Sequence, residues 1–332
     1  MRKIRRSLSA VLVLILCMTL VVPVAVAAPP LMPNAFGQKA YSHLLDLSST
    51  KRIAASEAEL AAATKIDGWF EGMGYTSELQ PFTYVRRGTT YSSQNVVAYR
   101  EATKKSKETT TPLVILGAHY DNVAAGFGAD DNASGVATML EIAERIARYQ
   151  TEYDIAFVAF GAEEVGLRGS AYYAGQLSEA DRARTIVMIN FDSLIVGDKL
   201  YIHAGANEKT WARDEMLGLI ERRKLPIEMQ PGLNPDYPAG YTPDGFSDYT
   251  AFNQAGIPIV AFESTNWEIG DLDGYEQTEE FGSFWHTPND NLSIIESMLP
   301  GRPLVRLHAY TKLVFEFLKH LNPDVEMRDV VG

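Results

Sequence analysis

Cysteine is almost absent from this chain. Its 332 residues contain one cysteine, Cys17, which excludes a disulfide framework and any metal site built from several thiolates. A bound metal ion would therefore need histidine, aspartate or glutamate ligands. Histidine is also scarce, and only two of the 6 histidines, His119 and His286, lie in motifs that also contain polar or acidic residues. The other four have no comparable context: His43, His203, His308 and His320.

Basic residues are outnumbered by acidic ones. The chain has 30 lysines and arginines against 42 aspartates and glutamates, a formal net charge of −12. A field of this sign repels nucleic acid and anionic lipid and attracts cationic ligands. The apolar share of 46% is high enough for a large buried core, which excludes a disordered chain.

Only one long apolar run is present, near the start of the chain. The stretch Ala10–Val22 follows Arg2, Lys3, Arg5 and Arg6 and is followed by Ala25-Val26-Ala27. This is the pattern of a signal peptide, and it predicts residues 1–27 as a removable leader and 28–332 as one exported domain, secreted or periplasmic. An uncleaved N-terminal anchor is the alternative. No later stretch resembles a membrane segment.

Short apolar runs alternate with stretches of helical period through the rest of the chain. We expect buried strands at Leu113–Gly117, Asp154–Phe160, Ile186–Phe191 and Ile257–Phe262, because continuous apolar runs are typical of strands covered on both faces. The fold class is therefore α/β, a single three-layer domain with a mostly parallel central sheet and helices on both faces. We expect Ile195–Ile202 to form a hairpin around Gly197-Asp198.

Polar side chains follow three of these strands directly. They are His119 and Asp121 after the first, Glu163 and Glu164 after the second, and Asp192 after the third. Each motif alone has an ordinary interpretation: a partly buried histidine, acidic residues at a helix start, or a capping aspartate. Because the carboxyl ends of parallel strands meet at one edge of a sheet, these side chains are expected to converge.

A further histidine, His286, follows the last core strand across an acidic loop. Two histidines and three carboxylates, those of Asp131, Glu164 and Asp192, suit two divalent ions with one carboxylate between them. Adjacent glutamates cannot both face one partner, so one of Glu163 and Glu164 could bind metal while the other acts as a general base.

Taken in order, the motifs GAHYD, GADDNASG, GAEE, NFD and WHT resemble those of the co-catalytic two-zinc aminopeptidases, the group that includes bacterial leucyl aminopeptidases and relatives of glutaminyl cyclases. The resemblance covers roughly residues 55–321 and implies the phosphorylase/hydrolase-like zinc exopeptidase architecture. Four other stretches resemble the alkaline phosphatase isozyme conversion aminopeptidases most closely: 190–205, 231–240, 264–277 and 299–302.

Carried over position by position, the resemblance implies two zinc ions and a role for each residue of the motifs. His119 and Asp192 would bind one zinc, Glu164 and His286 the other, and Asp131 would bridge both. Glu163 would be the general base acting on a metal-bridged hydroxide, and Asp121 would hydrogen-bond His119. The resemblance also implies a cis peptide bond between Asp131 and Asn132. Some relatives have a tyrosine near the last histidine, whereas this chain has Trp285 just before His286, so the donor that stabilises the oxyanion stays open.

The implied activity is removal of the N-terminal residue from peptides or proteins. The loop 268–280 carries six acidic residues and no lysine or arginine, which either favours basic N-terminal residues or is simply a solvated surface. Two other functions stay open. One is a glutaminyl-peptide cyclotransferase, which resembles these enzymes in fold but uses one zinc, and the other is an inactive exported binding module. The ligand types would also accept cobalt or manganese.

Overall fold

One mixed sheet of eight strands organises the chain. The computed structural model describes residues 34–105 and 110–322, so the expected leader at residues 1–27 lies outside the described residues. The strands are β1 (Thr76–Arg86), β2 (Thr89–Arg100), β3 (Leu113–His119), β4 (Asp154–Phe160), β5 (Thr185–Phe191), β6 (Lys199–Gly205), β7 (Tyr241–Thr242) and β8 (Ile259–Thr265). 

Helices of very different length connect these strands. They are α1 (Gln38–Leu47), α2 (Glu57–Gly72), α3 (Ser134–Ile146), α4 (Arg168–Gln176), α5 (Glu179–Arg184), α6 (Trp211–Arg223), α7 (Tyr249–Gln254), α8 (Leu292–Met298) and α9 (Arg302–His320), with a short irregular turn η1 (Ala129–Ala133) before α3. Within the described ranges, no helix is both long and apolar enough to cross a bilayer.

The strand order is β1-β2-β4-β3-β5-β8-β6-β7. The four central strands β4, β3, β5 and β8 run parallel to one another, and β2 and β6 flank them antiparallel. All seven residues of β3, β4 and β5 are buried, as the continuous apolar runs predicted. The predicted α/β fold with a mostly parallel centre is confirmed.

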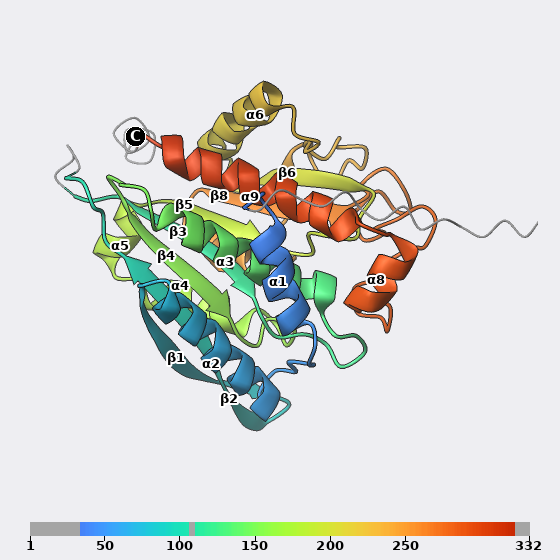
Figure 1. Ribbon diagram of the computed structural model, residues 1–332, viewed down its shortest axis with the longest axis horizontal. Coiled ribbons are helices and arrows are strands. Elements are labelled where there is room, and N and C mark those ends of the chain that lie inside the picture. Colours follow the sequence, from blue (N-terminus) through green and yellow to red (C-terminus); the bar gives the residue numbers. More distant parts are fainter. Residues whose placement is uncertain (1–33, 106–109, 323–332) are drawn as a thin grey trace, which may run out of the picture. The chain divides into compact units, whose positions relative to one another are not determined.

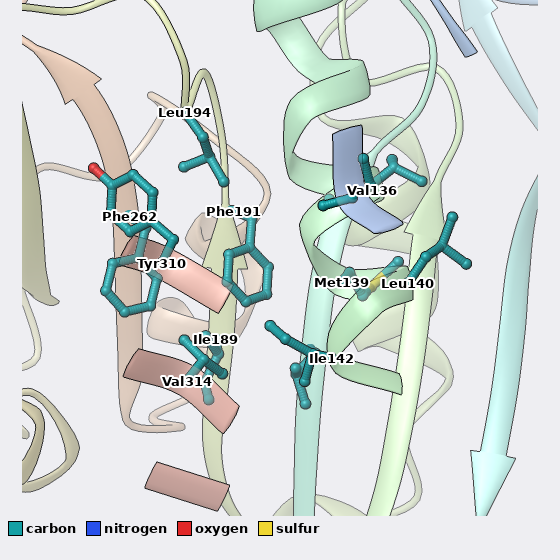
Figure 2. Close-up of a cluster of buried hydrophobic side chains, with 14 of the residues drawn as sticks. Val136, Met139, Leu140, Ile142, Ile189, Phe191, Leu194, Phe262, Tyr310 and Val314 are labelled. Carbon is teal, nitrogen blue, oxygen red and sulfur yellow. The ribbon is translucent and has the colours of Figure 1, made fainter. Parts of the chain in front are cut away.

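Helices pack on both faces of the sheet, which makes three layers (Figure 1). On one face α3 packs against both α1 and α9. Figure 2 shows the core on this side, where Val136, Met139 and Ile142 of α3 lie near Ile189 and Phe191 of β5. The other face is covered by α4 and α7, and its smaller core contains Phe160, Tyr173 and Phe252.

The hairpin expected at Ile195–Ile202 is wrong. Residues 195–198 form no strand, and β6 begins at Lys199 and pairs antiparallel with β8. The backbone N–H groups of Ile195 and Val196 donate to Oδ1 of Asp130, at 2.7 and 3.2 Å. The side chain of Asp130, 65 positions away from Ile195, thus accepts the hydrogen bonds that a hairpin would have used. The pattern of apolar residues along the sequence does not indicate such a distant contact.

Candidate metal centre

The strand ends bring the predicted side chains to one edge of the sheet. His119 is the last residue of β3, Glu164 follows β4 by four residues, and Asp192 comes directly after β5. Because β4, β3 and β5 are neighbours and parallel, their carboxyl ends meet there. Asp131 lies in η1, and His286 lies in the loop between β8 and α8. Ligand atoms of His119, Asp131 and Glu164 all lie within 4.8 Å of one another.

Asp131 stands between two pairs of side chains. Its Oδ1 is 3.2 Å from Nε2 of His119, which is 3.5 Å from Oδ1 of Asp192. Its Oδ2 is 3.2 Å from Nε2 of His286, which is 3.1 Å from Oε2 of Glu164. Each oxygen of Asp131 therefore faces one histidine–carboxylate pair, and this is the arrangement that a carboxylate shared by two metal ions requires.

The backbone around Asp131 is fixed from several sides. Asp290 accepts the N–H groups of Asp130 and Asp131, at 2.6 and 3.2 Å. The Asp131–Asn132 peptide bond is cis, as the resemblance implied. Asn132 in turn donates to the carbonyl of Phe191 at 2.8 Å, which is the residue before Asp192. These contacts join the loop of Asp131 to the end of β5.

Asp121 lies beside His119, but its carboxylate does not make the contact that the resemblance implied. Nδ1 of His119 lies 3.2 Å from the backbone carbonyl of Asp121 and 3.7 Å from its carboxylate. The carboxylate oxygens of Asp121 instead accept the N–H groups of Glu163 and Glu164, at 2.9 and 3.2 Å. One residue therefore orients the histidine through its backbone and the two glutamates through its side chain.

The electrostatics of this cluster favour bound positive charge. Burial and the nearby Asp131 raise the pKa of Glu164 to about 7. Although burial opposes its ionisation, hydrogen bonds from His119 and His286 lower the pKa of Asp131. Hydrogen bonds to Asp131 and Glu164 raise the pKa of His286 to about 11. Neutral imidazoles and carboxylates are ligands that zinc prefers, so the donor set and its charge fit divalent ions.

Gln277 connects the two halves of the centre. This side chain is fully buried, and its Nε2 donates to Oδ2 of Asp130 at 2.5 Å. Its Oε1 accepts the N–H groups of Phe284 and Trp285, at 2.8 and 3.2 Å. Gln277 thus ties the residue before Asp131 to the segment just before His286.

Replacing Gln277 by leucine is expected to weaken metal binding about 10- to 100-fold, because the loop of His286 loses its link to Asp130. Unfolding stability should also fall by about 1–3 kcal/mol, since buried polar groups are left without partners. Metal titration and denaturant unfolding would measure the two effects. The exposed Gln176→Leu is the matched control and should change neither. Undiminished metal affinity in Gln277→Leu would show that the loop holds its position without this link.

A cavity of about 300 Å³ opens over the cluster. His119, Asp131, Asp192 and His286 line it together with Glu163, the residue expected to act as the base. Buried polar atoms without a protein hydrogen bond also occur among its lining residues. Those are Oδ1 of Asn190, both ring nitrogens of His203 and Nε1 of Trp285. Buried polar atoms normally have partners, so a polar ligand fits this cavity.

Several of these residues could not be found from the sequence. Gln277 and Asp290 act through contacts with backbone groups far away in the chain, and no spacing rule connects them with Asp131. His203 has no polar motif around it, yet it is buried and lines the cavity. The only available signal was the nearness of Asp290 to His286 in the sequence.

The three-layer fold, with paired carboxylates and imidazoles at one edge of its sheet, defines a metal-dependent hydrolase of the α/β exopeptidase type. The sequence profile described as peptidase family M28 matches residues 95–302. The chain therefore belongs to peptidase family M28, which confirms the predicted enzyme class, a metallo-aminopeptidase. Curated relatives agree with this assignment.

Two curated relatives differ in how much of their length the chain covers. The alkaline phosphatase isozyme conversion protein of Escherichia coli is 32% identical over 95% of this chain and 97% of its own length. Aminopeptidase YwaD of Bacillus subtilis is 31% identical over 68% of this chain, which corresponds to 45% of that protein. The chain thus spans nearly all of the first relative and less than half of the second.

Solved structures share the fold at low identity. The zinc aminopeptidase BSAP of Bacillus subtilis aligns with a TM-score of 0.68 at 19% identity, over 87% of this chain and 97% of that one. A glutaminyl cyclase of Porphyromonas gingivalis aligns with a TM-score of 0.64 at 20% identity, over 86% and 99%. Both therefore support the architecture alone.

Proposed function

We propose that this chain is a two-zinc aminopeptidase that removes the N-terminal residue from peptides or proteins. The observation that carries the proposal is the position of Asp131, whose two carboxylate oxygens each lie 3.2 Å from a different histidine. His119 and Asp192 would hold one ion, Glu164 and His286 the other, and Asp131 both. A single-ion site would not need the pair formed by His119 and Asp192.

Glu163 is the proposed general base. A pair of divalent ions at this position would lower the pKa of a bound water towards about 7 and polarise the peptide carbonyl. Glu163 accepts the proton of the attacking water and returns it to the departing amine. Burial in the cavity wall raises the pKa of its carboxyl group, which suits a group that has to hold a proton between these two steps. Its backbone is held by Asp121.

The proposed substrates are peptide or protein N-termini outside the cytoplasm, with two zinc ions as cofactors. Export rests on the leader expected at residues 1–27. A preference for basic N-terminal residues is supported by the acidic loop 268–280, from which Tyr275 reaches the cavity. The proposal includes no nucleic-acid or membrane partner, because the negative net charge of the chain repels nucleic acid and anionic lipid.

Metal analysis together with a panel of aminoacyl amides tests the proposed function. We expect two zinc ions per chain, release of the N-terminal residue, loss of activity with a chelator and recovery with zinc. Arginyl amides should be cleaved faster than leucyl amides, and the difference should shrink at high salt if the acidic loop steers substrate. One tightly bound zinc with ammonia release from N-terminal glutamine would instead support a glutaminyl cyclase. If the metal-loaded protein neither hydrolyses aminoacyl amides nor releases ammonia from N-terminal glutamine, the result would support an inactive binding module.

A further inference from the structure

One carboxylate in the cavity has no part in the proposed reaction. Glu263 lies on β8, next to the end of β5, and lines the same cavity as the metal cluster. The N–H of Asp192 donates to the carbonyl of Phe262 at 3.1 Å, and the N–H of Ser264 donates to the carbonyl of Ser193 at 2.8 Å. Glu263 is therefore level with Asp192 on the neighbouring strand, and the two side chains share one face of the sheet.

Two neighbours fix the position of the Glu263 side chain. Nε1 of Trp267 donates to its Oε1 at 2.5 Å, and Nε2 of His203 lies 2.9 Å from the same atom. Both contacts use Oε1, which leaves Oε2 without either partner. The side chain is 22% exposed, so it reaches the cavity.

Aromatic side chains line the cavity together with this carboxylate. No lysine or arginine occurs among the described residues that line the cavity. Aromatic side chains together with the one lining carboxylate that has no part in the proposed reaction suit a substrate side chain with an apolar stem and a cationic end. The aromatic lining residues are Phe246, Tyr249, Phe262, Tyr275 and Trp285.

We propose that Glu263 determines substrate specificity by receiving the cationic side chain of an N-terminal arginine or lysine. This inference rests on the proposed aminopeptidase function and adds to it the residue that selects the substrate. The neighbouring position of Glu263 and Asp192 explains why one cavity can hold both the reacting peptide bond and the side chain next to it. The acidic loop would act earlier, by attracting cationic substrates to the cavity.

The substitution Glu263→Gln separates charge from structure. A glutamine oxygen still accepts the N–H of Trp267, so a purely structural role would survive the change. We expect kcat/KM for arginyl amides to fall about 10- to 100-fold, the effect of losing a charge-assisted hydrogen bond. Leucyl amides should change less than about twofold. The matched control is Glu228→Gln, an exposed glutamate that does not line the cavity.

Two further measurements keep the result independent of turnover and of variant folding. Calorimetry on metal-loaded Glu163→Gln should show that adding Glu263→Gln weakens binding of argininamide and not of leucinamide. The unmodified protein should also prefer arginyl over citrullyl amides, because citrulline has the same shape without the charge.

Each outcome decides a different question. Equal losses for arginyl and leucyl amides would overturn the inference, because Glu263 would then serve the α-amine or the fold. An unchanged ratio, or equal use of arginyl and citrullyl amides, would overturn it as well. If no amide is hydrolysed by the unmodified protein, the proposed function fails, and the calorimetric comparison still decides whether Glu263 binds the cationic side chain.

Discussion

Replacement of Glu163 by glutamine is expected to lower kcat about 100- to 10,000-fold while both metal ions stay bound. The size of the loss is that of removing a general base from its reaction. Glutamine keeps the shape of the side chain but cannot take a proton from water. The backbone N–H of this residue would still donate to Asp121, so the neighbouring Glu164 should keep its position. Steady-state kinetics and metal analysis of the same preparation would measure both quantities.

The matched control for this variant is the adjacent Glu164→Gln. Glu164 lies 3.1 Å from His286 and is a proposed ligand, so its replacement should reduce metal content along with activity. Both variants, Glu163→Gln and Glu164→Gln, should therefore lose activity, and only Glu164→Gln should also lose metal. Turnover of Glu163→Gln within about tenfold of the unmodified enzyme would assign the base to another residue.

Replacement of Asp131 by asparagine is expected to weaken both metal ions at once. An amide offers one oxygen and no negative charge, whereas the carboxylate of Asp131 faces both histidines. Even residues behind the ligands typically change metal affinity 10- to 100-fold, so we expect at least about a 100-fold loss for a shared ligand. Activity should fall with metal content. Dialysis against buffered zinc, followed by metal analysis, would measure the loss.

Variants of the outer ligands provide the comparison for Asp131. Asp192→Asn alters the pair with His119 only, so one of the two ions should be weakened and the other retained. Two ions retained in Asp131→Asn at the affinity of the unmodified protein would contradict the shared-ligand arrangement. A parallel loss of both ions in Asp192→Asn would show that the two positions fill together.

Much of the fold could be predicted because its signal is local. The run Asp154–Phe160 was predicted with the bounds that β4 has, since a strand covered on both faces is apolar at nearly every position. The hairpin predicted at Ile195–Ile202 is wrong, because the acceptor for the N–H groups of Ile195 and Val196 is the side chain of Asp130.

The candidate site, like the fold, was predicted from the sequence only in part. The proximity of His119, Glu164 and Asp192 follows from strand ends that meet at one edge of a parallel sheet. The roles of these residues came from the resemblance and remain proposals. The carboxylate of Asp121 was assigned to His119, but it accepts the N–H groups of two glutamates. A motif places a residue near its neighbours and leaves open which of its atoms makes each contact.

The sequence by itself determined the apolar strands, the order of the motifs and the kinds of ligand that reach the edge of the sheet. These properties depend on residue type and on separations of a few positions, where backbone geometry leaves few choices. Only the tertiary structure decided that Asp131 faces both histidines, that Gln277 joins two loops and that Glu263 lies beside Asp192. Hydrogen bonds act over about 3 Å in space, whatever number of residues separates the two groups along the chain.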